Sequence, residues 1–253
     1  MTDNPKICAT IEARMSSSRL PGKVMMKHEG VPLVKIMVDR IRKSKFIDSV
    51  IVATTTNTND DSLCEYLKSE EIDFYRGSEE NVLQRVLDSA DSHDCDIIVE
   101  LTGDCPLIDH AVIDEAIEAF LSNPEVDYVA NTTITNSYPR GSDVQVFTTE
   151  TLRQVSKETN DLDDLENVSY YIYRTEGRFN LLPMNAPSFD IHPDTRLTLD
   201  YPQDLDLICS VLTELGHDAS LQSICEFLNK NPETRNINTG ISVTYINDQN
   251  RNS

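Results

Sequence analysis

Positive charge and small side chains gather in residues 13–23, "ARMSSSRLPGK", directly after a short apolar run. The three serines leave backbone N–H groups accessible, and such groups can form a concave anion-binding site. Arg14 and Arg19 can each bind two phosphate oxygens, while Lys23 adds a mobile point charge. Neither a P-loop pattern nor G-x-G-x-x-G follows the apolar run. The segment predicts a phosphate-binding loop of another kind, although a solvated basic turn has the same composition.

Two aspartates come at the ends of expected strands, Asp104 in "LTGDCPL" and Asp200 in "LTLDYPQDL". Carboxylates are suitable ligands for Mg²⁺, which commonly shares the phosphate oxygens of a substrate. Taken singly, each aspartate is equally compatible with a helix cap or a turn. Together with the basic loop, the pair predicts magnesium-assisted displacement at a nucleotide phosphate.

Short apolar runs alternate with amphipathic stretches along the chain. Strands are expected over 6–12, 49–55, 73–77, 96–103, 126–132, 144–147, 179–185 and 196–200, and helices over 32–45, 60–71, 80–93, 111–122, 149–159, 164–177 and 201–216. The pattern predicts an α/β fold with a mostly parallel central sheet and helices on both faces. Ligands bind beyond the carboxyl ends of such strands. Residues 13–23, 54–60, 76–81, 102–106 and 200–204 are expected at that edge.

The alternation loosens after residue 131 and resumes at residue 196. We interpret residues 1–231 as a single domain, with 132–195 as an inserted acceptor-binding and dimerisation subdomain laid over the sheet. Residues 232–253 read as a polar C-terminal tail, in which 241–246 could add an edge strand.

The chain has 253 residues and a formal net charge of -21. This acidity argues against duplex nucleic acid and anionic membranes as partners, because both attract positive surfaces. No apolar stretch approaches the roughly 20 residues that a membrane-spanning helix needs. The first ten residues lack a secretion signal, so we expect a cytoplasmic protein. The six cysteines form no CxxC pair, which disfavours a zinc site.

Six motifs occur in order between about residues 5 and 215: "ARMSSSRLPGK", "VATTTNTND", "YRGSEENVLQR", "LTGDCPLID", "YPRGSDVQVF" and "RLTLDYPQDL". In series they are similar to the sugar cytidylyltransferase family, and most similar to its spore-coat polysaccharide branch. Acylneuraminate and 3-deoxy-manno-octulosonate cytidylyltransferases are related to that branch. The resemblance implies a nucleotide-diphospho-sugar transferase fold, which is Rossmann-like and GT-A-like. It also implies a Mg²⁺-dependent reaction with CTP that releases pyrophosphate, a sugar or small anionic acceptor, and a homodimer.

The resemblance also implies roles for individual residues. Catalytic roles fall on Arg14, Lys23, Asp104 and Asp200, of which the two aspartates would hold the metal. Nucleotide binding falls on Ala13, Arg14, Ser16, Arg19, Lys23, Thr54, Thr55, Arg76, Gly77, Ser78, Asn81, Thr102 and Gly103, and acceptor binding on Tyr138, Arg140 and Glu166. The chain has Asn167 where the branch often has His, and "GDCP" where octulosonate enzymes have "GDEP". The octulosonate sugar is therefore not inherited as the substrate.

Two other functions are open to the same fold. A glycosyltransferase would need a D-x-D metal site after a strand, but Asp94-Cys95-Asp96 precedes its strand. A non-catalytic nucleotide-binding protein would not need Lys23 together with two strand-end aspartates. The residues favour in-line attack of an acceptor oxygen on the α-phosphorus of a nucleoside triphosphate, without a covalent enzyme intermediate.

Overall fold

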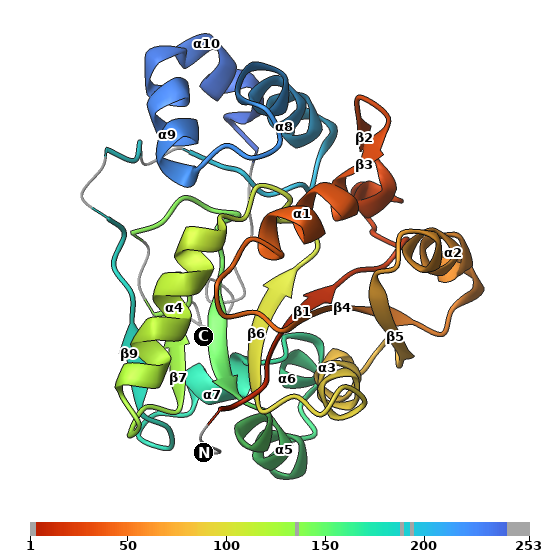
Figure 1. Ribbon diagram of the computed structural model, residues 1–253, viewed down its shortest axis with the longest axis vertical. Coiled ribbons are helices and arrows are strands. Elements are labelled where there is room, and N and C mark those ends of the chain that lie inside the picture. Colours follow the sequence, from red (N-terminus) through yellow and green to blue (C-terminus); the bar gives the residue numbers. More distant parts are fainter. Residues whose placement is uncertain (1–3, 135–136, 188–189, 193–194, 242–253) are drawn as a thin grey trace.

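The computed structural model describes residues 4–134, 137–187, 190–192 and 195–241. At its centre lies a seven-stranded sheet with the order β5-β4-β1-β6-β8-β7-β9 (Figure 1). The strands are β1 (Ile7–Glu12), β4 (Ser49–Thr55), β5 (Asp73–Gly77), β6 (Ile97–Thr102), β7 (Tyr128–Ala130), β8 (Gln145–Thr148) and β9 (Leu181–Pro183). Strands β5, β4, β1 and β6 are mutually parallel, whereas β8 runs antiparallel to both of its neighbours. The predicted α/β class and the mostly parallel sheet are confirmed.

Apolar side chains leave the sheet on both faces and are covered by different helices. Along β1, Ala9 and Ile11 point into one core and Cys8 into the other. The first core is closed by α1 (Leu33–Ile41), α2 (Asp61–Ser69), α4 (His110–Ser122), α8 (Pro202–Leu215) and α9 (Leu221–Lys230). The second is closed by α3 (Val82–Asp91), α5 (Thr149–Glu158) and α7 (Tyr170–Arg174), and α6 (Leu162–Glu166) contacts α3. Helices on both faces are thereby confirmed.

Short elements complete the chain. A two-stranded hairpin, β2 (Lys27–His28) and β3 (Val31–Pro32), follows the 3-10 turn η1 (Lys23–Met25), and a second such turn, η2 (Thr58–Asp60), precedes α2. Within the described ranges, no helix combines the length and the apolar composition needed to span a lipid bilayer.

Two expected elements differ from the structure. Residues 196–200 do not form a strand of the sheet: apart from one bridge between Arg140 and Arg196, the segment bonds to loops. Its Leu199 N–H donates to the carbonyl of Asp104 at 2.7 Å. The strand prediction was wrong because an alternation of leucines indicates which side chains are buried. It does not show that the backbone hydrogen-bonds to a neighbouring strand. The expected helix over 164–177 is divided into α6 and α7.

The predicted insertion and the predicted C-terminal tail both contribute regular structure to the fold. Residues 132–195, expected to lie over the sheet, contribute β8 and β9 to it. The expected polar tail begins with α10 (Pro232–Arg235) and η3 (Asn236–Asn238). The edge strand suggested over 241–246 lies outside the described residues beyond Ile241.

Arg40 of α1 is a buried charge that joins three parts of the fold. Its guanidinium donates to the carbonyls of Leu107 and Ile108, which precede α4, and to those of His217 and Ala219 between α8 and α9. These four bonds run from 2.6 to 2.9 Å. One side chain thus fixes the loops that follow β6 and α8.

We expect Arg40→Leu to lower the free energy of unfolding by about 3 kcal/mol, because four buried carbonyls lose their donors. Urea denaturation would measure the change. Arg42→Leu is the matched control, since the exposed Arg42 donates one bond, to the carbonyl of Glu71. A control loss as large as the Arg40 loss would contradict the assigned role.

Candidate active site

A pocket of about 320 Å³ lies beyond the carboxyl ends of β1 and β6. It is open to solvent and mostly polar. The loop that the sequence predicted to bind phosphate forms one wall, and α3, α6 and the segment before α8 approach it from other sides. The pocket is lined by Glu12, Ala13, Arg14, Ser17, Ser18, Arg19, Lys23, Val24, Val82, Arg85, Thr102, Gly103, Asp104, Glu166, Asn167 and Asp200.

The basic loop is folded back on itself and anchored to its neighbours. Gly22 adopts a left-handed φ of 72°, which an L side chain rarely tolerates, and its N–H donates to the carbonyl of Met15 at 2.8 Å. The Met15 N–H in turn donates to Asp60 Oδ1 at 2.7 Å. Ser17 and Ser18 face the pocket. The loop is therefore held with small residues on its inner wall, as an anion site requires.

Glu79 accepts hydrogen bonds from two side chains of the loop that the sequence predicts to bind phosphate. Its Oε1 accepts hydrogen bonds from Arg14 Nη1 at 3.2 Å and from Ser16 Oγ at 2.8 Å. Hydrogen bonds from Asn57 and Ser16 lower the pKa of Glu79 below its ordinary value. The carboxylate thus shows that these side chains converge on one anion.

Lys23 lies between the two predicted aspartates. Its Nζ is 3.2 Å from Asp104 Oδ2 and 3.1 Å from Asp200 Oδ1. Arg19 Nη2 also reaches Asp200, at 3.2 Å. Burial disfavours the charged forms of Lys23 and Asp104, but the Lys23 ammonium and the Thr102 hydroxyl still hold the pKa of Asp104 below its ordinary value. The two aspartates likewise raise the pKa of Lys23 against its burial.

The position of Asp200 is fixed by groups behind it. Arg196 Nη2 donates to Asp200 Oδ2 and to Asp204 Oδ2, both at 3.0 Å. Asp204 also accepts from the backbone N–H of Asp200 at 2.9 Å and from Asn238 Nδ2 at 2.8 Å. Asp200 therefore presents one oxygen to Lys23 and Arg19 and the other to Arg196.

Asp104 and Asp200 both pair with one cation, the ammonium group of Lys23. In the described part of the chain, no three His, Cys, Asp or Glu side chains gather as a complete metal cage would. Two carboxylates are nevertheless enough for Mg²⁺, which usually retains waters and takes phosphate oxygens as further ligands. Because Asp104 and Asp200 already converge on one ammonium group, the donor set fits such a cation.

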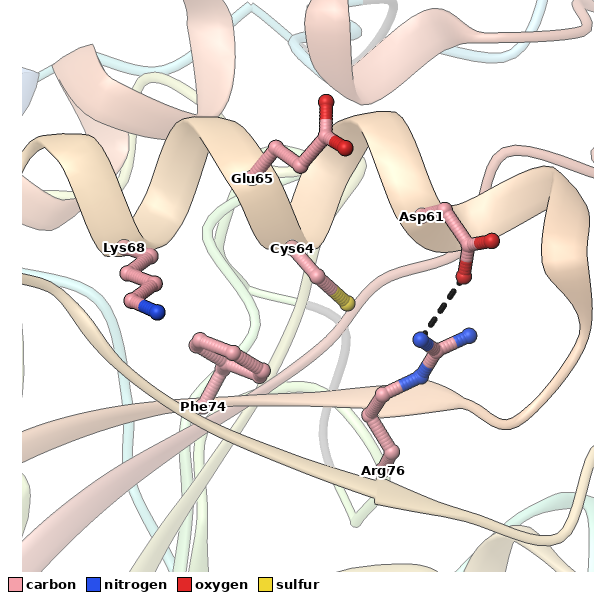
Figure 2. A pocket seen from close by; sticks show the side chains of 6 residues that line it. All are labelled: Asp61, Cys64, Glu65, Lys68, Phe74 and Arg76. Atoms are coloured by element: carbon pink, nitrogen blue, oxygen red, sulfur yellow. Dashed lines mark ion pairs between the residues drawn. The ribbon is translucent and has the colours of Figure 1, made fainter.

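Some predicted nucleotide contacts lie outside the pocket. Arg76 points away from it, toward α2, and lines a separate surface pocket between α2 and β5 (Figure 2). Its guanidinium donates to the carbonyls of Thr55 and Asn57, both at 2.8 Å, and pairs with Asp61 at 2.7 Å. The Thr54 and Thr55 hydroxyls are buried and donate to Asp60. These residues shape the loop after β4 and do not line the pocket.

Three other predicted residues shape the start of α3. Ser78 Oγ accepts from the N–H of Asn81, whose own Oδ1 caps the helix by accepting from Gln84. A Cβ on Gly77 would lie 2.8 Å from Cγ of Arg85. Together these residues position Arg85, which does line the pocket.

The predicted acceptor residues are separated in space. Glu166 lines the pocket, next to Asn167. Tyr138 is buried beside α4, where its hydroxyl lies 3.5 Å from Glu115 Oε2. Arg140 forms a backbone β-bridge with Arg196 and does not line the pocket. The structure therefore brings one of the three to the pocket.

Sequence reasoning missed several lining residues, above all Glu12, Arg85 and Asn167. Two of them carried a signal. Glu12 is a charged residue at the end of an apolar strand, and Arg85 is a charged residue on the inward face of an amphipathic helix. The D-x-D at 94–96 lies before β6, at the opposite edge of the sheet, as expected.

Residues 8–231 match the sequence profile of a family described as cytidylyltransferase. The chain belongs to the cytidylyltransferase family. It is 31% identical over 232 residues to the spore coat polysaccharide biosynthesis protein SpsF of Bacillus subtilis, covering 88% of this chain and 94% of that protein. Cytidylyltransferases are nucleotidyltransferases, so the family is one of enzymes.

Solved cytidylyltransferase structures share the fold. That of a cytidylyltransferase from Leptospira borgpetersenii matches with a TM-score of 0.86 and 29% identity, over 95% of this chain and 100% of that one. A CMP:2-keto-3-deoxy-manno-octonic acid synthetase complexed with CTP matches with a TM-score of 0.63 and 16% identity, over 83% of this chain and 99% of that one. The resemblance seen in the sequence is thereby confirmed.

Asp204→Asn should destabilise the protein by about 2 kcal/mol at neutral pH, because the buried carboxylate accepts several charge-assisted bonds. Bonds from Arg196, Asp200 and Asn238 lower the pKa of Asp204 below its ordinary value of 3.8, despite burial. The stabilisation is therefore complete above pH 3.8 and is lost as the pH falls through the lowered value. Chemical denaturation at pH 7, 5 and 3 should give equal differences at the first two and a smaller one at pH 3. A difference independent of pH would contradict this.

Proposed function

We propose that this protein transfers CMP from CTP to a sugar, sugar-acid or phosphate-bearing acceptor, with Mg²⁺ as cofactor and release of pyrophosphate. The proposal is carried by one observation: Arg14, Arg19 and Lys23 line the same pocket as Asp104 and Asp200, and Lys23 pairs with both aspartates. Membership of the cytidylyltransferase family supports cytosine as the base. A structural relative with the same fold is a synthetase complexed with CTP.

The basic side chains would bind the triphosphate. Arg14 and Ser16 now bind the carboxylate of Glu79, and a phosphate group offers the same kind of oxygen. Arg19 is half-exposed, with its guanidinium 5.4 Å from the ring of Tyr201, so it can turn toward an entering anion. Charge stabilisation and alignment of this kind supply most of the acceleration in phosphoryl chemistry.

Asp104 and Asp200 would hold Mg²⁺, which when bound neutralises charge on the phosphates. Lys23 would then leave the aspartates and donate to phosphate oxygens. Thr102 keeps Asp104 oriented with a bond of 2.6 Å, and Arg196 keeps Asp200 oriented. The acceptor oxygen attacks the α-phosphorus, and the bond between that phosphorus and the leaving pyrophosphate breaks. A hydroxyl acceptor releases its proton to solvent, and no covalent bond to the enzyme forms.

Glu166, the last residue of α6, and Asn167, which follows it, border the pocket and would approach the acceptor. The named relatives include enzymes for a 2-keto-3-deoxy sugar acid and a spore coat polysaccharide protein, so acceptors of both types belong in the assay. We further propose that the protein acts in the cytoplasm as a homodimer.

Pyrophosphate release tests the reaction directly. The assay combines Mg²⁺, each of the four ribonucleoside triphosphates, and a panel of 2-keto-3-deoxy sugar acids, sugar phosphates and phosphonates. We expect release with CTP and one class of acceptor. Release with another triphosphate but not with CTP would overturn the proposal. If no acceptor supports release, CTP binding measured by calorimetry decides whether the nucleotide site stands.

Asp104→Ala should lower pyrophosphate release at least about 1,000-fold while the fold is retained, because the metal and Lys23 both lose a partner. Asp206→Ala, an exposed change on α8, is the matched control and should leave turnover unchanged. Circular dichroism and thermal melting would check folding. Near-normal turnover by folded Asp104→Ala would refute the metal and lysine assignments.

A further inference from the structure

The pocket contains two charged residues that the phosphate chemistry does not use, Glu12 and Arg85. Glu12 is the last residue of β1 and is half-buried. Arg85 comes from α3 and is 3% exposed. Both line the pocket. No ion pair joins them within the described residues, although they are close enough for each to influence the charge of the other.

Arg85 carries a buried N–H that no protein group satisfies. Its Nη1 donates to the carbonyl of Ser78 and, at 3.5 Å, to that of Glu79, but its Nε has no partner. A buried donor without an acceptor destabilises the protein, because the group has lost its water and gained no partner. Because the side chain borders the pocket, this cost can be recovered by a ligand that brings an acceptor.

Glu12 is oriented by a second carboxyl group, that of Glu100 on β6. The parallel register pairs Glu12 with Thr102, which places Glu100 diagonally next to Glu12 on the same face of the sheet. Glu12 Oε1 and Glu100 Oε2 are both buried without an ordinary partner. One proton between the two carboxyls satisfies both oxygens, and burial favours it by raising the pKa of each group. Glu12 then donates to Glu100, and its second oxygen remains as an acceptor.

Apolar side chains and backbone lie beside the two charged residues. Ala13 and Val82 provide apolar surface beside the two charged residues. The backbone is tightly packed, since a Cβ on Gly103 would lie 2.8 Å from the carbonyl oxygen of Glu12. Glu12 directly precedes the basic loop and lines the same pocket, so the nucleoside of a triphosphate bound by that loop would lie within reach of Glu12.

We propose that Glu12 and Arg85 recognise the base, with Glu12 accepting from the exocyclic amino group and Arg85 donating to the ring nitrogen or carbonyl oxygen of cytosine. Uracil presents the opposite pattern, with a carbonyl in place of the amino group, so Glu12 rejects it. Glu100 is the positioning residue that keeps the acceptor oxygen of Glu12 turned toward the base. This inference rests on the proposed function, because it assigns the base selection of that same site.

Calorimetric binding of CTP and UTP in the presence of Mg²⁺ tests the proposal without knowledge of the acceptor. The wild type should bind CTP at least about 100-fold more tightly than UTP. Glu12→Leu should weaken CTP binding roughly 10- to 100-fold with little effect on UTP, so the preference collapses. Glu12→Gln should keep the preference, because its amide donates to Glu100 and its carbonyl accepts from the base. Glu80→Gln, an exposed change of the same chemistry, is the control.

A double substitution tests the role of Glu100 with the side-chain volumes preserved. In Glu12→Gln combined with Glu100→Gln, the second amide can either donate or accept, so the first amide is free to turn over. Its N–H₂ group can then donate to the uracil carbonyl, and the preference for CTP should fall at least about 10-fold. A preference equal to that of Glu12→Gln alone would overturn the role of Glu100.

The failures of the two proposals differ. If the wild type binds neither nucleotide, or binds UTP as tightly as CTP, the proposed function or its base assignment fails. If the wild type selects CTP and folded Glu12→Leu selects it equally well, Glu12 does not read the base. Equal weakening of CTP and UTP would likewise overturn base recognition and leave Glu12 with a structural role.

Discussion

The ion pairs of Lys23 with Asp104 and Asp200 hold the active site together. They join three segments that are far apart in the sequence: the loop after β1, the end of β6, and the turn before α8. Each member is buried enough to be costly alone, so the three positions depend on one another. In the absence of ligand, the lysine supplies the positive charge that keeps two carboxylates close together. The rest of the pocket is built around this arrangement.

The surrounding structure keeps these groups in place through successive contacts. Arg196 and Asp204 fix the outer side of Asp200, and Asp60 fixes the basic loop from the end of β4. Arg40 does the same at a greater distance by holding the loop after β6. Preorganisation of this type lets a site stabilise charge without rearranging its own dipoles during reaction.

Much of this could be predicted from the sequence, because it follows from local rules. Alternating apolar runs identified β1, β4, β5 and β6, and the rule that ligands bind beyond parallel strand ends placed Asp104 at the pocket. Asp200 reaches the same pocket from a segment that is not a strand of the sheet, so its position was expected for the wrong reason. The strand-end rule does not identify the lining residues where tertiary contacts determine the direction of a side chain. Arg76 follows a strand at the correct edge, but its side chain turns toward α2 to satisfy two loop carbonyls. Tyr138 and Arg140 lie in a region where the sequence has no hydrophobic periodicity. The sequence also gave no sign that Glu12 would lie next to Glu100 on the neighbouring strand.

The contact of Asn238 with Asp204 links the end of the described chain to the centre of the molecule. Asn238 is buried and donates both to Asp204 and to the carbonyl of Arg196 at 3.0 Å. A proteolytic nick between α9 and α10 would free this donor, together with Ile237 at the edge of the first core, and would leave the second core untouched. The protein could then remain folded by spectroscopy and yet lose the alignment of Asp200. Limited digestion at that connection would be a route to inactivation that leaves the sheet and its helices unchanged.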